Sequence, residues 1–277
     1  LERYALKYSE RFYNFGIAEQ DMISAAAGMA KEGLIPFAST YGTFASMRVT
    51  DQVRVAMGYM NLPVKLVGLT SGLSVGILGP THISLEDIAI MRAIPNIVIL
   101  SPADCTETCK AVLAASKIDA PVYIRLTGTQ NNPVVYNDDY NFEIGKNISV
   151  REGSDIVIFA TGTMVNKSLE ASKILEAQIG CSVAVIDVHT IMPLDTKSID
   201  ENLSADLIVT VEEHGVIGGL GSAIAEYLAL KKNKPVHLLI GCERKYEHAG
   251  SYEYLLNQYG LTSKQIADNI SKTWEKL

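Results

Sequence analysis

The segment Phe12-Tyr-Asn-Phe-Gly-Ile-Ala-Glu-Gln20 places a carboxylate, Glu19, at the start of an expected helix. Residues 21–31 are rich in Ala and Met, and a helix with such small side chains can pack closely against a neighbour. Asn14 and Gly16 supply turn residues that break the chain just before it. A carboxylate in a first turn can simply complement the helix dipole. The segment alone leaves a structural and a functional role for Glu19 open.

Outward from this segment, residues 1–135 alternate short apolar runs with helical patterns. Such alternation predicts a mostly parallel sheet covered by helices. Asp104 is expected to be a helix N-cap, with Glu107 completing a capping box. The expected strands are 34–38, 64–69, 97–100 and 122–126, and the expected helices are 44–59, 85–92 and 104–117.

A second α/β unit follows a break in this rhythm. Residues 130–146 carry turn residues and little core, and we interpret 136–147 as a linker. The fold class is therefore α/β, with two domains at 1–135 and 148–277, each a mostly parallel sheet covered by helices. In the second domain, we expect strands at 155–160, 182–187, 207–211 and 236–240, and helices at 165–178, 195–203, 219–230 and 263–274.

Composition is consistent with two globular domains, because 277 residues with 48% hydrophobic and 20% charged side chains can build ample cores. The net charge of −7 argues against nucleic acid or an acidic membrane surface as the partner. No apolar run reaches bilayer length. Cys105 and Cys109 lie one helical turn apart with no nearby residue to complete a metal site. The four cysteines suggest no disulfide framework, and a cytoplasmic location is expected.

Six motifs resemble, in order, thiamine-diphosphate enzymes of the transketolase type, and the resemblance covers nearly the whole chain. The chain is similar to the stand-alone C-terminal subunits of split transketolases, and more distantly to deoxyxylulose-phosphate synthases and β subunits of 2-oxoacid dehydrogenases. The motifs are Phe15-Gly-Ile-Ala-Glu-Gln20, Ser39-Thr-Tyr-Gly-Thr-Phe44, Gly79-Pro-Thr-His82, Glu86–Asn96, Ser101-Pro-Ala-Asp104 and Glu212–Ser222.

The resemblance implies a catalytic role for two residues and a cofactor contact for two more. Glu19 would share a proton with N1′ of the thiamine-diphosphate pyrimidine, so that the cofactor's amino group can deprotonate C2. Phe44 would stack on the pyrimidine, with Tyr41 beside it, although both could be ordinary core aromatics. His82 would exchange protons with a sugar hydroxyl.

The implied substrate contacts depart from the family pattern. Transketolases usually carry Asp before Gly-Pro-Thr-His and a His at the preceding strand end, where this chain has Leu78 and Ser71. Met47 replaces a second aromatic residue. Arg125 matches the family's phosphate-binding arginine, although it could also be a surface arginine at a strand end, and a guanidinium suits a sulfonate equally well. Ketol transfer is therefore expected. Ser71, His82 and Arg125 are expected to bind the substrate, which would be a sugar phosphate or a sulfonated sugar.

The remaining histidines and the glycine-rich run have structural interpretations. We expect His189, His237 and His248 to be structural, and His214 to brace the domain interface. Gly215–Gly221 follows an expected strand, but it lacks the third small residue of a dinucleotide loop. Tight packing of a helix on the sheet is the better interpretation.

The resemblance also implies a partner. This sequence has no Gly-Asp-Gly, the family's signature of the Mg²⁺ or Ca²⁺ site for the diphosphate. We therefore expect an N-terminal transketolase subunit to supply that metal, in an α2β2 assembly with the active site at the interface. The chain does not begin with Met, and a strand and loop are expected to precede Leu1. The alternatives are a decarboxylating 2-oxoacid dehydrogenase β subunit, a deoxyxylulose-phosphate synthase-like enzyme, or a non-catalytic scaffold.

Overall fold

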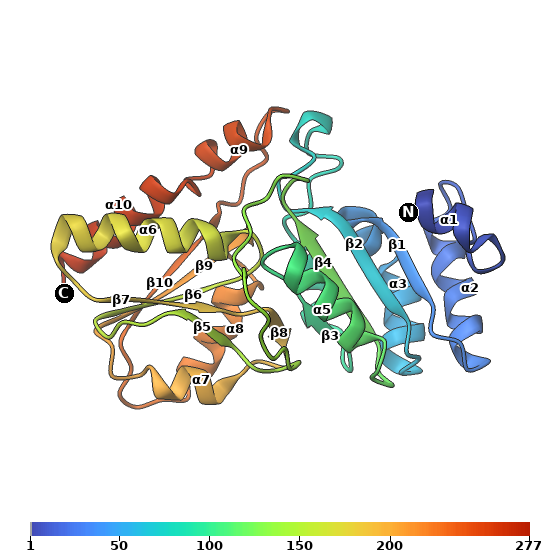
Figure 1. Ribbon diagram of the computed structural model, residues 1–277, viewed down its shortest axis with the longest axis horizontal. Coiled ribbons are helices and arrows are strands. Elements are labelled where there is room, and N and C mark those ends of the chain that lie inside the picture. Colours follow the sequence, from blue (N-terminus) through green and yellow to red (C-terminus); the bar gives the residue numbers. More distant parts are fainter. Residues whose placement is uncertain (1) are drawn as a thin grey trace.

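A computed structural model describes residues 2–277 and contains two five-stranded sheets (Figure 1). The first has the order β1 (Phe37–Tyr41), β2 (Lys65–Ser71), β4 (Val122–Thr127), β3 (Val98–Leu100), β8 (Thr190–Met192). The second has the order β10 (Val236–Cys242), β9 (Leu207–Gly215), β6 (Ile156–Ala160), β7 (Val183–Asp187), β5 (Ile148–Arg151). All pairs are parallel except β3–β8 and β5–β7, which confirms the expected α/β class.

Helices cover both faces of each sheet. The first half contains α1 (Glu2–Lys7), α2 (Glu19–Lys31), α3 (Thr50–Val53), α4 (Asp87–Arg92) and α5 (Cys105–Ala115). The second contains α6 (Met164–Ile179), α7 (Thr196–Glu201), α8 (Leu220–Leu228), α9 (Tyr252–Gln258) and α10 (Ser263–Trp274). The helix α5 packs on one face of the first sheet and α2 on the other, whereas α6 and α10 lie opposite α7 and α8 on the second.

Alternating strand residues build these double-sided cores. In β6, Ile156 and Ile158 face α6 and α10, while Val157 and Phe159 face α7 and α8. Because both faces are covered, the strand is a continuous apolar run in the sequence. Among residues 2–277, no helix is long and apolar enough to cross a membrane.

Several element boundaries differ from the sequence-based expectation. The expected strand 34–38 begins later, at Phe37, where pairing with Lys65 starts, and Leu34 and Ile35 are exposed. The expected helix 44–59 contains two π-helical segments, Phe44–Arg48 and Arg54–Tyr59, on either side of α3. The helix α9 and the strands β5 and β8 were not expected.

The capping of α5 is confirmed in part. Asp104 Oδ1 accepts a hydrogen bond from the Glu107 amide at 2.8 Å, as an N-cap should. Glu107, however, accepts from the amide of Ala103 rather than from that of Asp104. The N-cap is therefore present, and the expected reciprocal half of the capping box is shifted by one residue.

The two halves are joined by more than the linker. The strand β8 lies within the second half of the sequence but pairs with β3 of the first sheet, at Ile99–Met192 and Leu100–Thr190. Residues 128–147 connect the sheets without regular structure. The domain boundaries at 135 and 148 stay a prediction. The strand β8 lies beyond them in the sequence but belongs to the first sheet.

Candidate functional site

Glu19 is the first residue of α2, and its side chain is buried. Thr40 donates a hydrogen bond to its Oε1 at 3.4 Å, and Arg48 Nη1 donates to its Oε2 at 2.9 Å. Burial alone would raise the pKa of Glu19. Hydrogen bonds from Arg48, from the amide of Glu19 itself and from Thr40, together with the charge of Arg48, outweigh burial and lower the pKa below its ordinary value. The carboxylate is therefore held ionised at the mouth of the helix.

Three rings form a cluster that Arg48 links to this carboxylate, because its guanidinium also lies over the Phe44 ring. Tyr41 ends β1, Phe44 begins the following π-helical segment, and His82 follows the turn at Gly79. Their ring centroids lie 5.9 Å (Tyr41–Phe44), 5.7 Å (Tyr41–His82) and 5.3 Å (Phe44–His82) apart, all in edge-to-face arrangement. The hydroxyl of Thr81 lies 2.9 Å from His82 Nδ1 and can fix the ring.

The fold explains why these residues meet. The carboxyl end of β1 delivers Tyr41 and, after Gly42 and Thr43, Phe44. Gly42 is required there because a Cβ would collide with the Ser71 side chain at the end of the neighbouring β2. Gly79 has φ +75°, a conformation open to glycine, and the amide of His82 donates back to its carbonyl at 3.0 Å. Loops at the carboxyl ends of parallel strands are the usual place for a ligand in such sheets.

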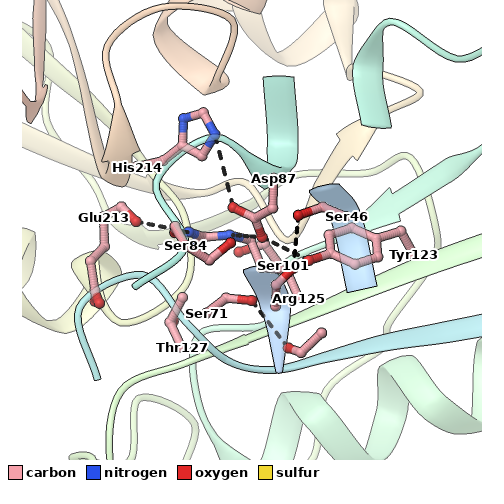
Figure 2. A network of polar contacts seen from close by, with 12 residues as sticks. Ser46, Ser71, Ser84, Asp87, Ser101, Tyr123, Arg125, Thr127, Glu213 and His214 are labelled. Carbon is pink, nitrogen blue, oxygen red and sulfur yellow. Dashed lines mark hydrogen bonds and ion pairs between the residues drawn. The ribbon is translucent and has the colours of Figure 1, made fainter. Parts of the chain in front are cut away.

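Arg125 does not join this cluster. Its side chain is 1% exposed and spans the two halves of the molecule (Figure 2). Its Nε donates to Asp87 Oδ2 at 2.9 Å, and its Nη2 donates to the carbonyl of Glu213 at 2.8 Å and weakly to that of Ser84 at 3.4 Å. We expected a guanidinium open to a phosphate or sulfonate. The structure shows one that is enclosed because the second half of the chain covers the end of β4.

Ser71 is likewise enclosed (Figure 2). Its hydroxyl donates to the carbonyl of Gly68 at 3.2 Å, and its side chain fills the space beside Gly42. The substrate contact expected of Ser71 therefore has no support from this geometry. Leu78, in contrast, is exposed in a short 3₁₀ turn, Gly76–Leu78, directly before the Gly79 turn.

The Glu212-Glu213-His214 segment anchors the second half of the chain to the first. His214 Nε2 accepts from the amide of Ala89 at 3.4 Å, and its Nδ1 lies 2.7 Å from the carbonyl of Gly215, so the ring is held as a neutral donor–acceptor. Burial lowers the pKa of His214 to about 4. These contacts confirm that His214 braces the interface.

The glycine-rich run serves packing, as expected. Glu212 accepts hydrogen bonds from the amides of Leu220 and Gly221, both at 2.8 Å, and so caps the N-terminus of α8. A Cβ at Gly219 would collide with the Glu212 carboxylate, and one at Gly221 would press on Thr210 and Leu239. The glycines let the helix start against the sheet and its carboxylate cap.

Sequence reasoning missed Arg48 and Thr40, the two side chains that hold Glu19. Arg48 stands one helical turn after Phe44, a spacing that places two side chains on the same face. That spacing was the available signal. Thr40 precedes Tyr41 in β1, so its side chain points to the opposite face of the strand from Tyr41, toward α2.

The site thus combines a buried acid, an aromatic face and a histidine at the carboxyl end of a parallel strand. This donor set fits a flat, nitrogen-containing ring that stacks on an aromatic side chain and hydrogen-bonds to a carboxylate. Fold and site are those of an α/β protein with a candidate site for such a ring at this end of the sheet.

Comparisons with known proteins define the family. Residues 2–132 match the family model "Transketolase, pyrimidine binding domain", and residues 145–266 match "Transketolase, C-terminal domain". The chain belongs to the transketolase family of thiamine-diphosphate enzymes.

Three relatives show how far the similarity extends. A "Putative transketolase C-terminal section" of Methanocaldococcus jannaschii is 39% identical over 274 residues, covering 99% of this chain and 86% of that protein. The "6-deoxy-6-sulfo-D-fructose transketolase subunit SqwH" of Clostridium sp. (strain MSTE9) is 39% identical over 280 residues, covering 100% and 85%. A solved structure described as "Split gene transketolase, inactive beta4 tetramer" aligns with TM-score 0.85 and 38% identity, over 97% of this chain and 85% of that one.

Proposed function

We propose that this chain is the C-terminal subunit of a two-subunit, thiamine-diphosphate-dependent transketolase. It would transfer a two-carbon ketol unit from a ketose to an aldose phosphate, in a complex with an N-terminal subunit. The relatives described as a "C-terminal section" and as a "subunit" support the split arrangement. We further propose an α2β2 complex in which the partner holds Mg²⁺ or Ca²⁺ with the cofactor's diphosphate.

The observation that carries the proposal is the cluster of Tyr41, Phe44 and His82 at one edge of the sheet, which Arg48 links to Glu19. When bound, thiamine diphosphate supplies a nucleophilic carbon that adds to a ketose carbonyl. Phe44 would orient the pyrimidine by stacking, and Glu19 would hold a proton against its N1′. His82, half-buried beside both rings, would move a proton to or from a substrate hydroxyl.

The donor is proposed to be a ketose phosphate or a ketose sulfonate. One relative is described as a 6-deoxy-6-sulfo-D-fructose transketolase subunit, and Leu78 places an exposed apolar side chain directly before the His82 turn. Because the Arg125 guanidinium is enclosed, we propose that other residues contact the phosphate or sulfonate group of the donor. Direct comparison of fructose 6-phosphate with 6-deoxy-6-sulfofructose as donor tests this choice.

The experiment is a ketol-transfer assay on the complex. The chain is co-purified with the product of a neighbouring reading frame that carries Gly-Asp-Gly, then assayed with thiamine diphosphate, Mg²⁺, each donor and an aldose phosphate. Glu19→Gln is expected to lower kcat by roughly 10²-fold or more, because it removes the proton-sharing acid. Glu32→Gln, an exposed position at the other end of the same helix, serves as the matched control and is expected to leave turnover unchanged.

Each alternative function predicts a different result in this assay. Carbon dioxide release from pyruvate without ketol transfer would favour a decarboxylating enzyme related to 2-oxoacid dehydrogenases or deoxyxylulose-phosphate synthases. Unchanged turnover in the Glu19→Gln complex would favour a non-catalytic scaffold. Either outcome overturns the transketolase proposal.

A further inference from the structure

Arg48 contacts two of the clustered residues at once. Its Nη1 donates to Glu19 Oε2 at 2.9 Å, and its guanidinium carbon lies 3.8 Å from the centroid of the Phe44 ring. At that separation the planar cation is in van der Waals contact with the ring and gains a cation–π attraction. One flat, nitrogen-rich group therefore satisfies the acid and the aromatic face together.

These are the two contacts that the proposed function requires of the cofactor's pyrimidine. A ring that stacks on Phe44 and hydrogen-bonds to Glu19 must lie on the side of Phe44 that faces Glu19, and the guanidinium lies there. Two planar groups cannot share one contact distance above a ring. Building on the proposed function, we propose that Arg48 is an internal competitor of the pyrimidine, and that the ring binds only after the Arg48 side chain has swung away.

The Arg48 side chain has room to leave. It is 41% exposed, whereas the Glu19 side chain that it contacts is 8% exposed. The Arg48 backbone is held separately, because Gln20 Nε2 donates to its carbonyl at 3.2 Å. Movement therefore needs only a change of side-chain rotamer toward solvent. Arg48 ends a π-helical segment, a local geometry that recurs at functional sites.

Displacement of Arg48 would also raise the pKa of Glu19. The hydrogen bond and charge of Arg48 are the main influences that offset burial at Glu19. Once the guanidinium leaves, burial is opposed only by the hydrogen bonds from the amide of Glu19 itself and from the Thr40 hydroxyl, so the pKa of the carboxyl rises and its protonated form becomes more populated. That is the form needed for an acid that shares a proton with a ring nitrogen. The same side-chain movement would thus free the binding place and prepare Glu19.

The test is the binding of thiamine, which carries the pyrimidine without the diphosphate, to the full chain by isothermal titration calorimetry. Arg48→Ala is expected to bind thiamine roughly five- to tenfold more tightly than the wild type, because a partly buried ion pair and a cation–π contact no longer compete. Arg48→Lys, which keeps the charge without the planar group, should fall between them. Arg54→Ala removes an exposed arginine at the start of the π-helical segment that follows α3, and should match the wild type.

A second readout is independent of binding strength. The carboxyl carbon of Glu19, followed by NMR against pH, should titrate at a higher pKa in Arg48→Ala than in the wild type. In the wild type, added thiamine should shift the Arg48 side-chain Nε signal and leave that of Arg54 in place.

The outcomes separate the two proposals. Equal or weaker thiamine binding by Arg48→Ala, with binding abolished by Glu19→Ala, would overturn the competitor role and leave the proposed cofactor site standing. No thiamine binding by any variant, Arg48→Ala included, would overturn both. Thiamine binding that Glu19→Ala does not weaken would place the ring elsewhere and would also overturn both.

Discussion

Partners, more than burial, decide the charge of the acidic residues. Glu19 and Asp87 are both buried, and each has a pKa below its ordinary value because an arginine outweighs burial: Arg48 for Glu19 and Arg125 for Asp87. Glu212 accepts two backbone hydrogen bonds but has no adjacent cation in contact, and burial raises its pKa to about 7. Of these three buried carboxyl groups, only the two that are paired with a guanidinium have a lowered pKa.

The Asp87–Arg125 pair yields a prediction about stability. Replacing Asp87 with Ala leaves the Arg125 guanidinium buried without its counter-ion and removes the acceptor of the Tyr123 hydroxyl, which donates to Asp87 at 2.7 Å. Loss of one partner of a buried pair costs about 3–5 kcal/mol of unfolding free energy. Urea unfolding of Asp87→Ala measures this loss.

The double variant is the control for that prediction. Asp87→Ala combined with Arg125→Met removes both charges. The double variant is expected to lose less unfolding free energy than the sum of the losses in Asp87→Ala and Arg125→Met. Additive losses would show that the two residues act separately. Because the pKa of Asp87 is lowered, its contribution is present above about pH 3.8, the ordinary value, and is lost as the pH falls below it.

At the scale of elements, the start of α5 depends on one side chain. Asp104 Oδ1 accepts from the Glu107 amide, and its Oδ2 accepts from the amides of Val135 at 2.7 Å and Tyr136 at 3.0 Å. One carboxylate thus caps the helix and fixes the segment that leads to the second sheet. Asp104→Ala is expected to lower the unfolding free energy by about 2 kcal/mol or more, above the usual cost of a lost cap.

Chemical denaturation of matched variants checks this. Asp195 caps α7 through the Ser198 amide and also accepts from Asn147 at 2.9 Å, so Asp195→Ala provides a comparison with one fewer backbone contact. A loss in Asp104→Ala no larger than in Asp195→Ala would contradict the dual role.

Elements with a strong local pattern were predictable from the sequence. Residues 263–274 were expected to be a helix, and α10 has those bounds, since Thr262 caps it and Ile266, Ala267 and Ile270 repeat on one face. The strand β8 was not predictable, because three residues that pair with a strand about 90 positions earlier leave no periodic signal. The start of β1 shifted for the same reason, since pairing with β2 and not the apolar run decided it.

Some residues of the candidate site were predictable from the sequence, and others were not. Motif residues placed Glu19, Tyr41, Phe44 and His82, and the structure brings them together. Arg125 was expected to be open because it ends a strand, but the covering by the second half of the chain is a tertiary effect. The ion pair of Arg48 with Glu19 joins residues 29 positions apart, so only the fold reveals it.

At the scale of the whole molecule, a group of acids and tyrosines joins the two halves. Glu107 lies on α5, and Asp187 ends β7 in the other sheet. Between them, Tyr136 donates to Asp187 at 2.6 Å and Tyr140 donates to Glu107 at 3.0 Å, with their two rings stacked at 4.0 Å. Both tyrosines belong to the connecting segment. Lys110 contacts the Tyr140 carbonyl at 2.7 Å, but among the described residues no cation contacts the carboxyl group of Glu107 or Asp187.

The two carboxyl groups of this junction favour their protonated forms. Burial raises the pKa of Glu107 to about 7, and burial together with the charge of Glu107 raises the pKa of Asp187 well above its ordinary value. The folded state therefore binds more protons at this junction than the unfolded chain does. Because stability falls with pH wherever the folded state binds more protons, this junction loses stability as the pH rises from about 4.5 to about 7.

Glu107→Gln removes that dependence while keeping an oxygen for the Tyr140 hydroxyl. Two buried histidines, His189 and His214, and the half-buried His237 have pKa values lowered to about 4 and act in the opposite direction. The informative quantity is therefore the difference in unfolding free energy between wild type and variant. Unfolding free energies from pH 4.5 to 8 should show the wild type losing up to about 1.4 kcal/mol per pH unit relative to Glu107→Gln. Glu32→Gln, which removes an exposed carboxylate, should run parallel to the wild type. If the Glu107→Gln and wild-type curves ran parallel too, the carboxyl pair would carry no excess proton, and the two halves would be joined by hydrogen bonds that do not depend on pH.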